Sequence, residues 1–239
     1  MKMYQISTLQ ALALGYTKSV TTVAKLVEHG DIGLGTFENV NGEMIVADGR
    51  CYRAAEDGSV VEASPEMGVP FASVAKITGA KKSPLEDIEN IQKLKEVLTL
   101  RIEEDFGLNS MHVGRIDGVF RKVSARSESA YESQHVDLKD ILSETQKDFV
   151  FEDIEGTLVC IYYPDYMDGI NASGWHIHFI SGDHTKGGHV FDIDIENAEL
   201  ALSKISDIEI KLPSEPSFDT YSLKEASGSD IKKVEQGSE

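Results

Sequence analysis

Three closely spaced tight turns constrain the fold of this chain more than any other sequence feature. Each combines Asn or Asp with Gly, a pair that favours a two-residue hairpin because both residues tolerate a positive φ. The turns Asn41-Gly42, Asp48-Gly49 and Asp57-Gly58 separate strand-like segments at residues 34–40, 44–48, 50–54 and 60–63. Successive segments joined in this way predict an antiparallel meander.

Helical periodicity is confined to a few other segments. The first covers residues 4–30, where apolar residues recur at helical spacing. Ser7 or Thr8 could cap a first run at Leu9, Leu12 and Ala13, and Gly30 could end a second run through Val23, Leu26 and Val27. A second helix is expected to start at Ser83-Pro84-Leu85-Glu86, to bury a stripe of Ile88, Ile91, Leu94, Leu98 and Ile102, and to end at Gly107. A third is expected within residues 138–149.

The rest of the chain favours strands. These are expected at residues 71–82, at 112–126 around a turn at Asp117-Gly118, and at 156–163, 174–180 and 189–195; residues 198–210 fit a helix or a strand, and the tail from Leu212 lacks core character. The fold class predicted is α/β of the α+β type, with mixed, mostly antiparallel β-sheets and a few flanking helices. Two sheet-based sub-domains are expected, at residues 1–150 and 151–239, which can also act as one structural unit.

Charge excludes two classes of partner. The 239 residues include 23 basic and 41 acidic side chains, for a formal net charge of −18. Phosphate backbones and anionic membrane surfaces recruit clustered Lys and Arg, so we expect neither a nucleic-acid nor a membrane partner.

Cysteine content and apolar runs indicate a reduced, cytoplasmic location. Cys51 and Cys160 are far apart in the sequence, which suggests neither a disulfide framework nor a thiolate zinc site. The short apolar run at residues 11–14 is smaller than the roughly 7 to 15 residues of a secretory signal. No stretch approaches the roughly 20 apolar residues of a membrane span.

The histidines carry the strongest functional signal. Four of the seven lie between residues 176 and 189. In a strand, Trp175, Ile177 and Phe179 would face a core while His176 and His178 project together from the other side. Glycines on both sides of the following turn let His189 return beside them. Three neutral imidazoles without a thiolate are typical of a catalytic zinc site, because a fourth position is left for water or substrate.

An alternative interpretation is a solvent-facing strand that happens to carry histidines. His189 also shares the parity of Phe191 and Ile193, which fits an entrance to a strand better than its regular interior. His184 is expected in the turn as a solvated residue. His29, His112 and His135 are scattered through the sequence, and we assign them no role.

At these residues the sequence resembles the α-acetolactate decarboxylases, and the resemblance runs through nearly the whole chain. Its marks are Tyr4-Gln5-Ile6-Ser7-Thr8, Gly33-Leu34-Gly35-Thr36-Phe37, Asn41-Gly42-Glu43-Met44, Pro70-Phe71-Ala72, Arg115-Ile116-Asp117-Gly118, Arg126-Ser127, residues 165–171, Gly174-Trp175-His176-Ile177-His178-Phe179 and Gly187-Gly188-His189-Val190. The histidine segment is the most specific, because spacing, glycines and apolar neighbours all match.

The resemblance implies a set of site residues. His176, His178 and His189 would hold Zn²⁺. Glu43, Arg126 and Glu235 would be catalytic, with Glu235 matched through a short Lys-Val-Glu ending. The position of His184 is often arginine among relatives. A homodimer is implied, and the start of the chain near the family's shared N-terminal segment supports a cytoplasmic location.

The reaction that the resemblance implies is decarboxylation of 2-acetolactate, a small anionic 2-hydroxy-3-oxo acid, to acetoin and CO₂. The bond cleavage leaves an electron pair that must delocalise onto the neighbouring ketone as an enediolate, and zinc would act there as a Lewis acid. Arg126 would orient the carboxylate. Glu43 or Glu235 would deliver a proton to carbon.

Two alternatives remain open from the sequence. The first is a cupin-like metal-binding or small-molecule-binding protein without catalysis, although such proteins expect a glutamate a few residues after the second His, where Ile180 to Asp183 stand. The second is an interaction protein with a structural zinc, which the scarcity of cysteines disfavours.

Overall fold

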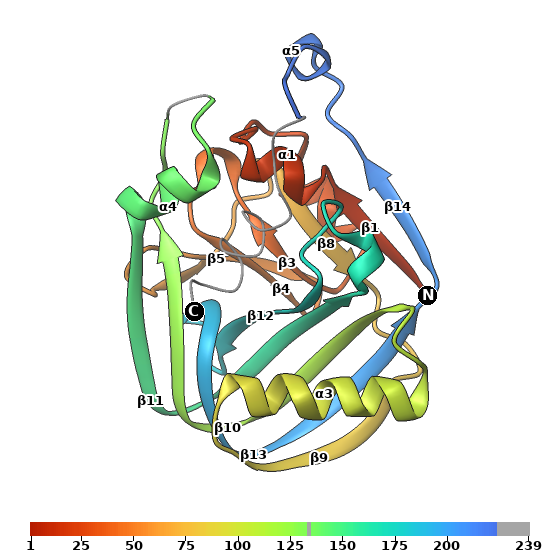
Figure 1. Cartoon of the computed structure of the whole chain (residues 1–239). Coiled ribbons are helices and arrows are strands. Elements are labelled where there is room, and N and C mark those ends of the chain that lie inside the picture. Colours follow the sequence, from red (N-terminus) through yellow and green to blue (C-terminus); the bar gives the residue numbers. More distant parts are fainter. Residues whose placement is uncertain (133–134, 224–239) are drawn as a thin grey trace.

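The computed structural model describes residues 1–132 and 135–223. Its two main sheets are built from distant parts of the chain (Figure 1). Short helices lie around the first sheet and one long helix packs on the second. The predicted class, mixed α+β with mostly antiparallel strands, is confirmed. Among the described residues, no helix combines the length and apolar character needed to cross a membrane.

The seven-stranded sheet contains the predicted meander. Its order is β14-β1-β8-β3-β4-β5-β6, with β1 at Lys2–Ile6, β3 at Ile32–Thr36, β4 at Glu43–Ala47, β5 at Arg50–Ala54, β6 at Val60–Glu62, β8 at Phe71–Ala75 and β14 at Asp207–Lys211. Strands β3 to β6 are antiparallel neighbours. Between β4 and β5, Asp48 and Gly49 have φ of 52° and 74°, as an Asp-Gly hairpin turn requires. The short strands β2 (Thr21–Thr22) and β7 (Gly68–Val69) pair separately.

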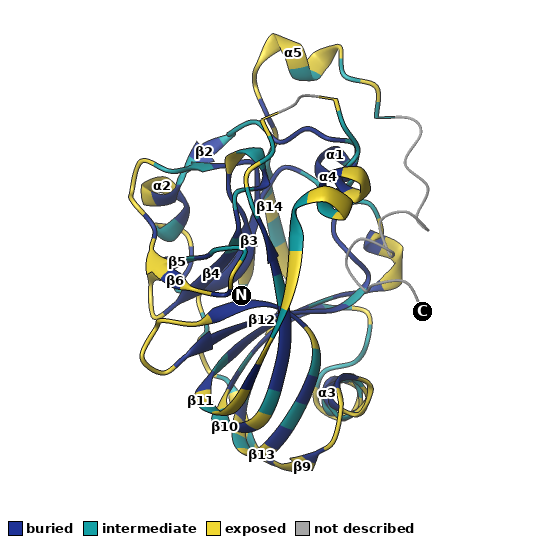
Figure 2. Ribbon diagram, turned by 90° about the vertical axis from the view of Figure 1, so that its left-hand side faces the viewer, coloured by how far each residue is buried: buried dark blue, intermediate teal, exposed yellow. Residues whose placement is uncertain are grey.

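The second sheet has five longer strands in the order β10-β11-β12-β13-β9. They are β9 at Lys81–Ile88, β10 at Met111–Glu128, β11 at Gln146–Tyr163, β12 at Gly174–Ser181 and β13 at Gly187–Ile205. Strand β10 also pairs with β13, so the pairings of β10, β11, β12 and β13 form a closed ring. Figure 2 shows the strong curvature that accompanies this closure.

One apolar core lies between the two sheets, and further apolar cores lie between the sheets and the helices. On β11, Val159 and Ile161 face the first sheet, whereas Leu158 and Cys160 face the buried stripe of α3 (Ile91–Asp105), as strand alternation requires. The helices α1 (Leu9–Ala13) and α4 (Leu138–Thr145) share a smaller core, and α2 (Val23–Val27) packs on the first sheet. The short helix α5 (Pro216–Asp219) follows β14, and two 3₁₀ turns lie at Glu38–Val40 and Asp165–Met167.

The helix predicted to start at Ser83 starts later. Residues 81–88 form β9, and the helix begins after Asn90, whose side chain accepts a hydrogen bond from the Lys93 amide at 2.8 Å. Among the described strands β9 pairs with β13 alone, so Pro84 sits on a sheet edge, where its missing N–H is tolerated. The predicted end at Gly107 is confirmed by its φ of 91° directly after the helix.

The turn predicted at Asp117-Gly118 is wrong. Strand β10 passes through it without interruption. A Cβ on Gly118 would lie 2.4 Å from the Asn197 carbonyl oxygen, so this glycine permits close approach of β13 and does not make a turn.

The helical interpretation of residues 4–30 is wrong in part. Residues 4–6 belong to β1, where tertiary pairing on both sides overrides the local pattern. Both predicted helical runs are confirmed, as α1 and α2, and Thr8 is the N-cap of α1, as expected. Residues 198–210, which fitted either a helix or a strand, belong to β13 and β14 apart from Ser206. The helix predicted at 138–149 ends at Thr145, and β11 begins at Gln146. Residue 150 lies within β11, and the division of the chain near it stays a prediction.

His112 gives the fold a testable pH dependence. Burial between the rings of Phe106 and Tyr162 lowers the pKa of His112 from 6.5 to about 4. The folded protein therefore binds fewer protons than the unfolded chain between these pH values, so its free energy of unfolding falls as the pH falls through this window. From pH 7 to pH 5 we expect wild type to lose on the order of 1 kcal/mol more than His112→Phe.

Urea unfolding at both pH values measures this difference. His29→Phe, which removes an exposed imidazole stacked on Tyr4, is the control and should follow wild type. Equal losses in wild type and His112→Phe would contradict the prediction.

Candidate metal centre

Strand β12 presents two histidines from one face. Trp175, Ile177 and Phe179 point into the core beneath α3. His176 and His178 project from the opposite face, toward the seven-stranded sheet, and are 7% and 0% exposed. The alternation predicted from the sequence is therefore confirmed, but the histidine face is buried and not solvent-facing.

His189 joins this pair because of how β13 is paired. It is the direct antiparallel partner of His178 on β12, and it is also opposite Arg126 on β10. Its apparent conflict in parity is resolved by a register shift. Asp192 pairs with Ser124 and Val190 with Ala125, so Phe191 is an extra residue, 38% exposed.

The three imidazoles converge on one point. His176 Nε2 lies 3.0 Å from His178 Nε2 and 3.2 Å from His189 Nδ1. One nitrogen from each of the three rings lies within 4.8 Å of the others. This spacing suits three donors around one metal ion, and the predicted grouping of the histidines is confirmed.

The protonation of the cluster favours a cation. Burial lowers the pKa of His176 to about 3, and the positive charge of Arg126 acts in the same direction. The pKa of His178 is also held well below its usual value, mainly by burial. The Nδ1 of His178 lies 2.9 Å from the Met44 carbonyl oxygen, so its N–H donates there and Nε2 is left as a lone-pair donor to the cluster. Neutral imidazoles facing each other at this distance fit a bound dication.

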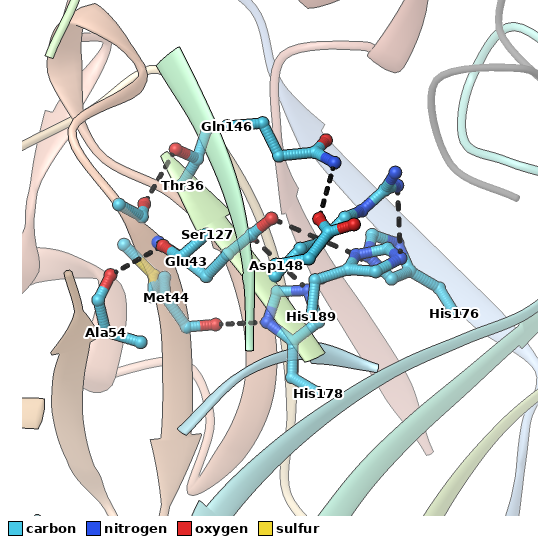
Figure 3. Close-up of polar contacts among 12 residues, drawn as sticks. Thr36, Glu43, Met44, Ala54, Ser127, Gln146, Asp148, His176, His178 and His189 are labelled. Carbon is cyan, nitrogen blue, oxygen red and sulfur yellow. Dashed lines mark hydrogen bonds and ion pairs between the residues drawn. The ribbon is translucent and has the colours of Figure 1, made fainter. Parts of the chain in front are cut away.

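Glu43 approaches the cluster from the other sheet. Its carboxylate oxygens lie 3.5 Å from His178 Nε2 and 3.9 Å from His189 Nδ1, and its side chain is 15% exposed (Figure 3). Its amide donates to Ser127 Oγ at 3.2 Å, and that hydroxyl donates to the Ala54 carbonyl at 2.8 Å. Ser127 thereby ties the start of β4 to β10.

Arg126 lies at the same junction. One guanidinium nitrogen is 3.5 Å from His189 Nε2. On its other side, the register places Arg126 opposite Asp148 of β11. The structure therefore brings together Glu43 and Arg126, both expected from the sequence, with the three histidines.

A cavity of about 40 Å³ opens beside these groups. One water needs roughly 10–15 Å³ on this scale, so the space suits a small ligand. Its apolar wall comes mainly from α1, α4 and β8. The lining residues are Leu12, Gly35, Thr36, Val40, Glu43, Phe71, Arg126, Glu128, Leu138, Leu142, Gln146, His176 and His189.

Sequence reasoning missed several of these residues. Glu128 is 2% exposed and lines the cavity, as do Gln146 and Thr36. The spacing of Glu128 two residues after Arg126 places both on one strand face and could have identified it. Glu235, expected from the resemblance, lies outside the described residues.

The other histidines stand apart from the cluster. His184 is exposed in the turn between β12 and β13, with its Nδ1 3.2 Å from the Tyr52 hydroxyl. His112 is buried between two aromatic rings, and His29 and His135 stack on Tyr4 and Tyr221.

Known proteins match this chain over nearly its whole length. A family model described as alpha-acetolactate decarboxylase matches residues 3–225. A curated relative of that name from Methanosarcina mazei is 36% identical over 234 residues, covering 98% of this chain and 80% of the relative. Another from Klebsiella aerogenes is 35% identical over 215 residues, covering 90% of this chain and 81% of the relative.

Two solved structures also superpose closely on this chain. The crystal structure of alpha-acetolactate decarboxylase from Bacillus subtilis strain 168 superposes with a TM-score of 0.93 at 28% identity, covering all of both chains. A Staphylococcus aureus protein of unknown function, described as similar to alpha-acetolactate decarboxylase, superposes with a TM-score of 0.91 at 25% identity, covering 98% of this chain and all of that one.

Single-histidine variants test the metal centre. We expect His176→Ala, His178→Ala and His189→Ala each to weaken zinc binding by about 100-fold or more, because each removes one of three protein ligands. His184→Ala should bind zinc like wild type. Metal content by mass spectrometry and zinc titration against a chelating dye measure both effects. Loss of zinc from the His184 variant, or retention in all three others, would refute the assignment.

Proposed function

The chain belongs to the α-acetolactate decarboxylase family, and from that membership we propose that it converts 2-acetolactate to acetoin and carbon dioxide at the three-histidine site, with zinc as the bound metal. As a member of this family it is an enzyme, a carboxy-lyase. The observation that carries the proposal is the convergence of three buried imidazoles with one carboxyl group and one guanidinium beside a small cavity.

The reaction creates charge on an oxygen. Breaking the bond to the carboxylate carbon leaves an electron pair on the former C2, and the neighbouring ketone oxygen accepts it as an enediolate. A dication held by three neutral ligands supplies Lewis-acid stabilisation of that negative charge. The three histidines support this chemistry by adding no negative charge of their own.

Arg126 orients the substrate. Its guanidinium is always charged and offers a planar fork of N–H donors that matches a carboxylate. Its position across the strand pair from His189 fixes this fork beside the histidine cluster. The residue would hold the departing carboxylate in place before the bond breaks.

Glu43 donates the proton to carbon. Acetoin forms when the carbon that lost CO₂ receives a proton, and a carboxyl group at the edge of the cluster can supply it. Glu43 enters from β4, from the sheet opposite the histidines, so protonation occurs from one side and gives a chiral product. Glu235 is the alternative donor that the resemblance implies.

The apolar wall excludes water from the reacting carbon. The apolar residues that line the cavity are Leu12, Val40, Phe71, Leu138 and Leu142. The methyl groups of acetolactate would contact this wall, because burial of apolar surface there is favourable. A metal-binding protein without catalysis is the weaker alternative, since the matches to decarboxylases extend over nearly the full chain.

A homodimer and a cytoplasmic location complete the proposal, both from the family resemblance. Sedimentation velocity of the purified protein tests the first, and fractionation of producing cells tests the second.

The activity itself has a direct test. Metal-free protein, prepared with a chelator, should form no acetoin from racemic 2-acetolactate above the spontaneous rate. Addition of zinc should restore acetoin formation. A zinc-loaded, folded protein that remains at the spontaneous rate would overturn the proposed function.

The roles of Arg126 and Glu43 predict a second set of results. Arg126→Ala should lower kcat/KM by roughly 100-fold or more, as for other lost transition-state contacts. Glu43→Gln should lower kcat by roughly 100- to 10,000-fold, because the amide cannot donate a catalytic proton in the same way. Both should retain zinc.

Matched controls are available on the same sheets. Arg121→Ala removes an exposed arginine from β10, and Glu62→Gln an exposed glutamate from β6. Both should keep wild-type kinetics. Near wild-type turnover in Arg126→Ala or Glu43→Gln would remove that residue from the mechanism.

A further inference from the structure

Glu128 is a buried acid in the cavity, and it has no role in the proposed reaction. It is 2% exposed and lines the cavity together with Glu43, Arg126, His176 and His189. It follows Arg126 by two residues on β10, so the two side chains leave the same face of that strand.

Strand pairing holds the backbone of Glu128 at the end of β10. The register places it opposite Gln146 of β11, and Arg126 opposite Asp148. The side-chain amide of Gln146 donates to Asp148 Oδ1 at 2.9 Å (Figure 3). The carboxyl group is therefore carried by a paired strand and not by a loop, which fixes its place relative to the histidines.

A carboxylate at this depth needs compensation. Taking an ionised group out of water is costly unless opposite charges lie near it. Arg126 on the same strand face and a dication in the histidine cluster provide such charges. The cavity can therefore hold Glu128 as a carboxylate.

We propose that Glu128 is a specificity-determining residue that sets the net charge of the cavity and selects monoanionic over dianionic ligands. The inference rests on the proposed function, which supplies the dication and the substrate. Among the described residues that line the cavity, Glu128 offsets one of the three positive charges that a bound dication and Arg126 would supply, while Glu43 carries the proton for the product. The positive charge that remains attracts the single carboxylate of a 2-hydroxy-3-oxo acid, whereas a second carboxylate on the ligand is repelled by Glu128.

The test compares two ligands of similar size and different charge. Malonate is a dianion at neutral pH and its monomethyl ester is a monoanion. Isothermal titration calorimetry on zinc-loaded protein gives the dissociation constant of each, and their ratio is the selectivity. Glu128→Gln should raise the preference for malonate about tenfold, because a unit charge in the cavity wall acts on the ligand through an effective dielectric constant near 20.

Two variants separate charge from packing. Glu128→Asp keeps the charge and should keep the wild-type ratio. Glu144→Gln removes an exposed glutamate from α4, the helix that contributes Leu142 to the cavity, and should also leave the ratio unchanged. Zinc content and urea unfolding are measured for every variant.

The outcomes are distinct. A ratio for Glu128→Gln within twofold of wild type, in folded and zinc-loaded protein, overturns the proposal. An equal shift in Glu128→Asp assigns the effect to packing and also overturns it. Acetoin formation is assayed in parallel. If wild type forms none, the proposed function fails, while the binding ratio still decides whether Glu128 selects by charge.

Discussion

The double pairing of His189 is the constraint on which the site depends. This residue is opposite His178 on one strand and opposite Arg126 on another, at the point where β13 leaves β12 and continues along β10. A hairpin alone would bring the histidines together, but it would not place a guanidinium beside them. The closed ring of strands does both, and the bulge at Phe191 lets His189 face the cluster while Val190 and Ile193 remain in the core.

The packing of the two sheets supplies what one sheet lacks. The five-stranded sheet carries the histidines, Arg126 and Glu128, and the seven-stranded sheet carries Glu43. Apolar residues between the sheets fix their separation. The contacts from Ser127 to β4 and β5 and from His178 to Met44 connect them at the site itself. The charged side chains at the site therefore come from elements that are remote in sequence.

The acidic composition and the cationic requirement of the site are compatible because they act at different ranges. A net charge of −18 describes the surface, where salt screens it within about 8 Å at physiological ionic strength. Inside the cavity, the guanidinium and the dication of the proposed function would be screened less, so they would attract a small anion there. Buried neutral imidazoles make this possible, since burial keeps the pKa of His176 and His178 well below neutrality.

Local residue patterns were enough to predict the local features: the Asp48-Gly49 hairpin, the α3 stripe ending at Gly107, and the His-x-His alternation of β12. Each depends on near neighbours, so spacing and residue type suffice. Tertiary structure decided the rest. Pro and Gly often mark helix starts and turns, but here both residues lie in strands. Pro84 is tolerated at the edge of the sheet, and Gly118 allows the close approach of β13. Glu128 looks like any surface acid in the sequence. It is buried in a cavity whose other walls come from α1, α4, β3, β4 and β8, so its burial depends on residues far away in the chain.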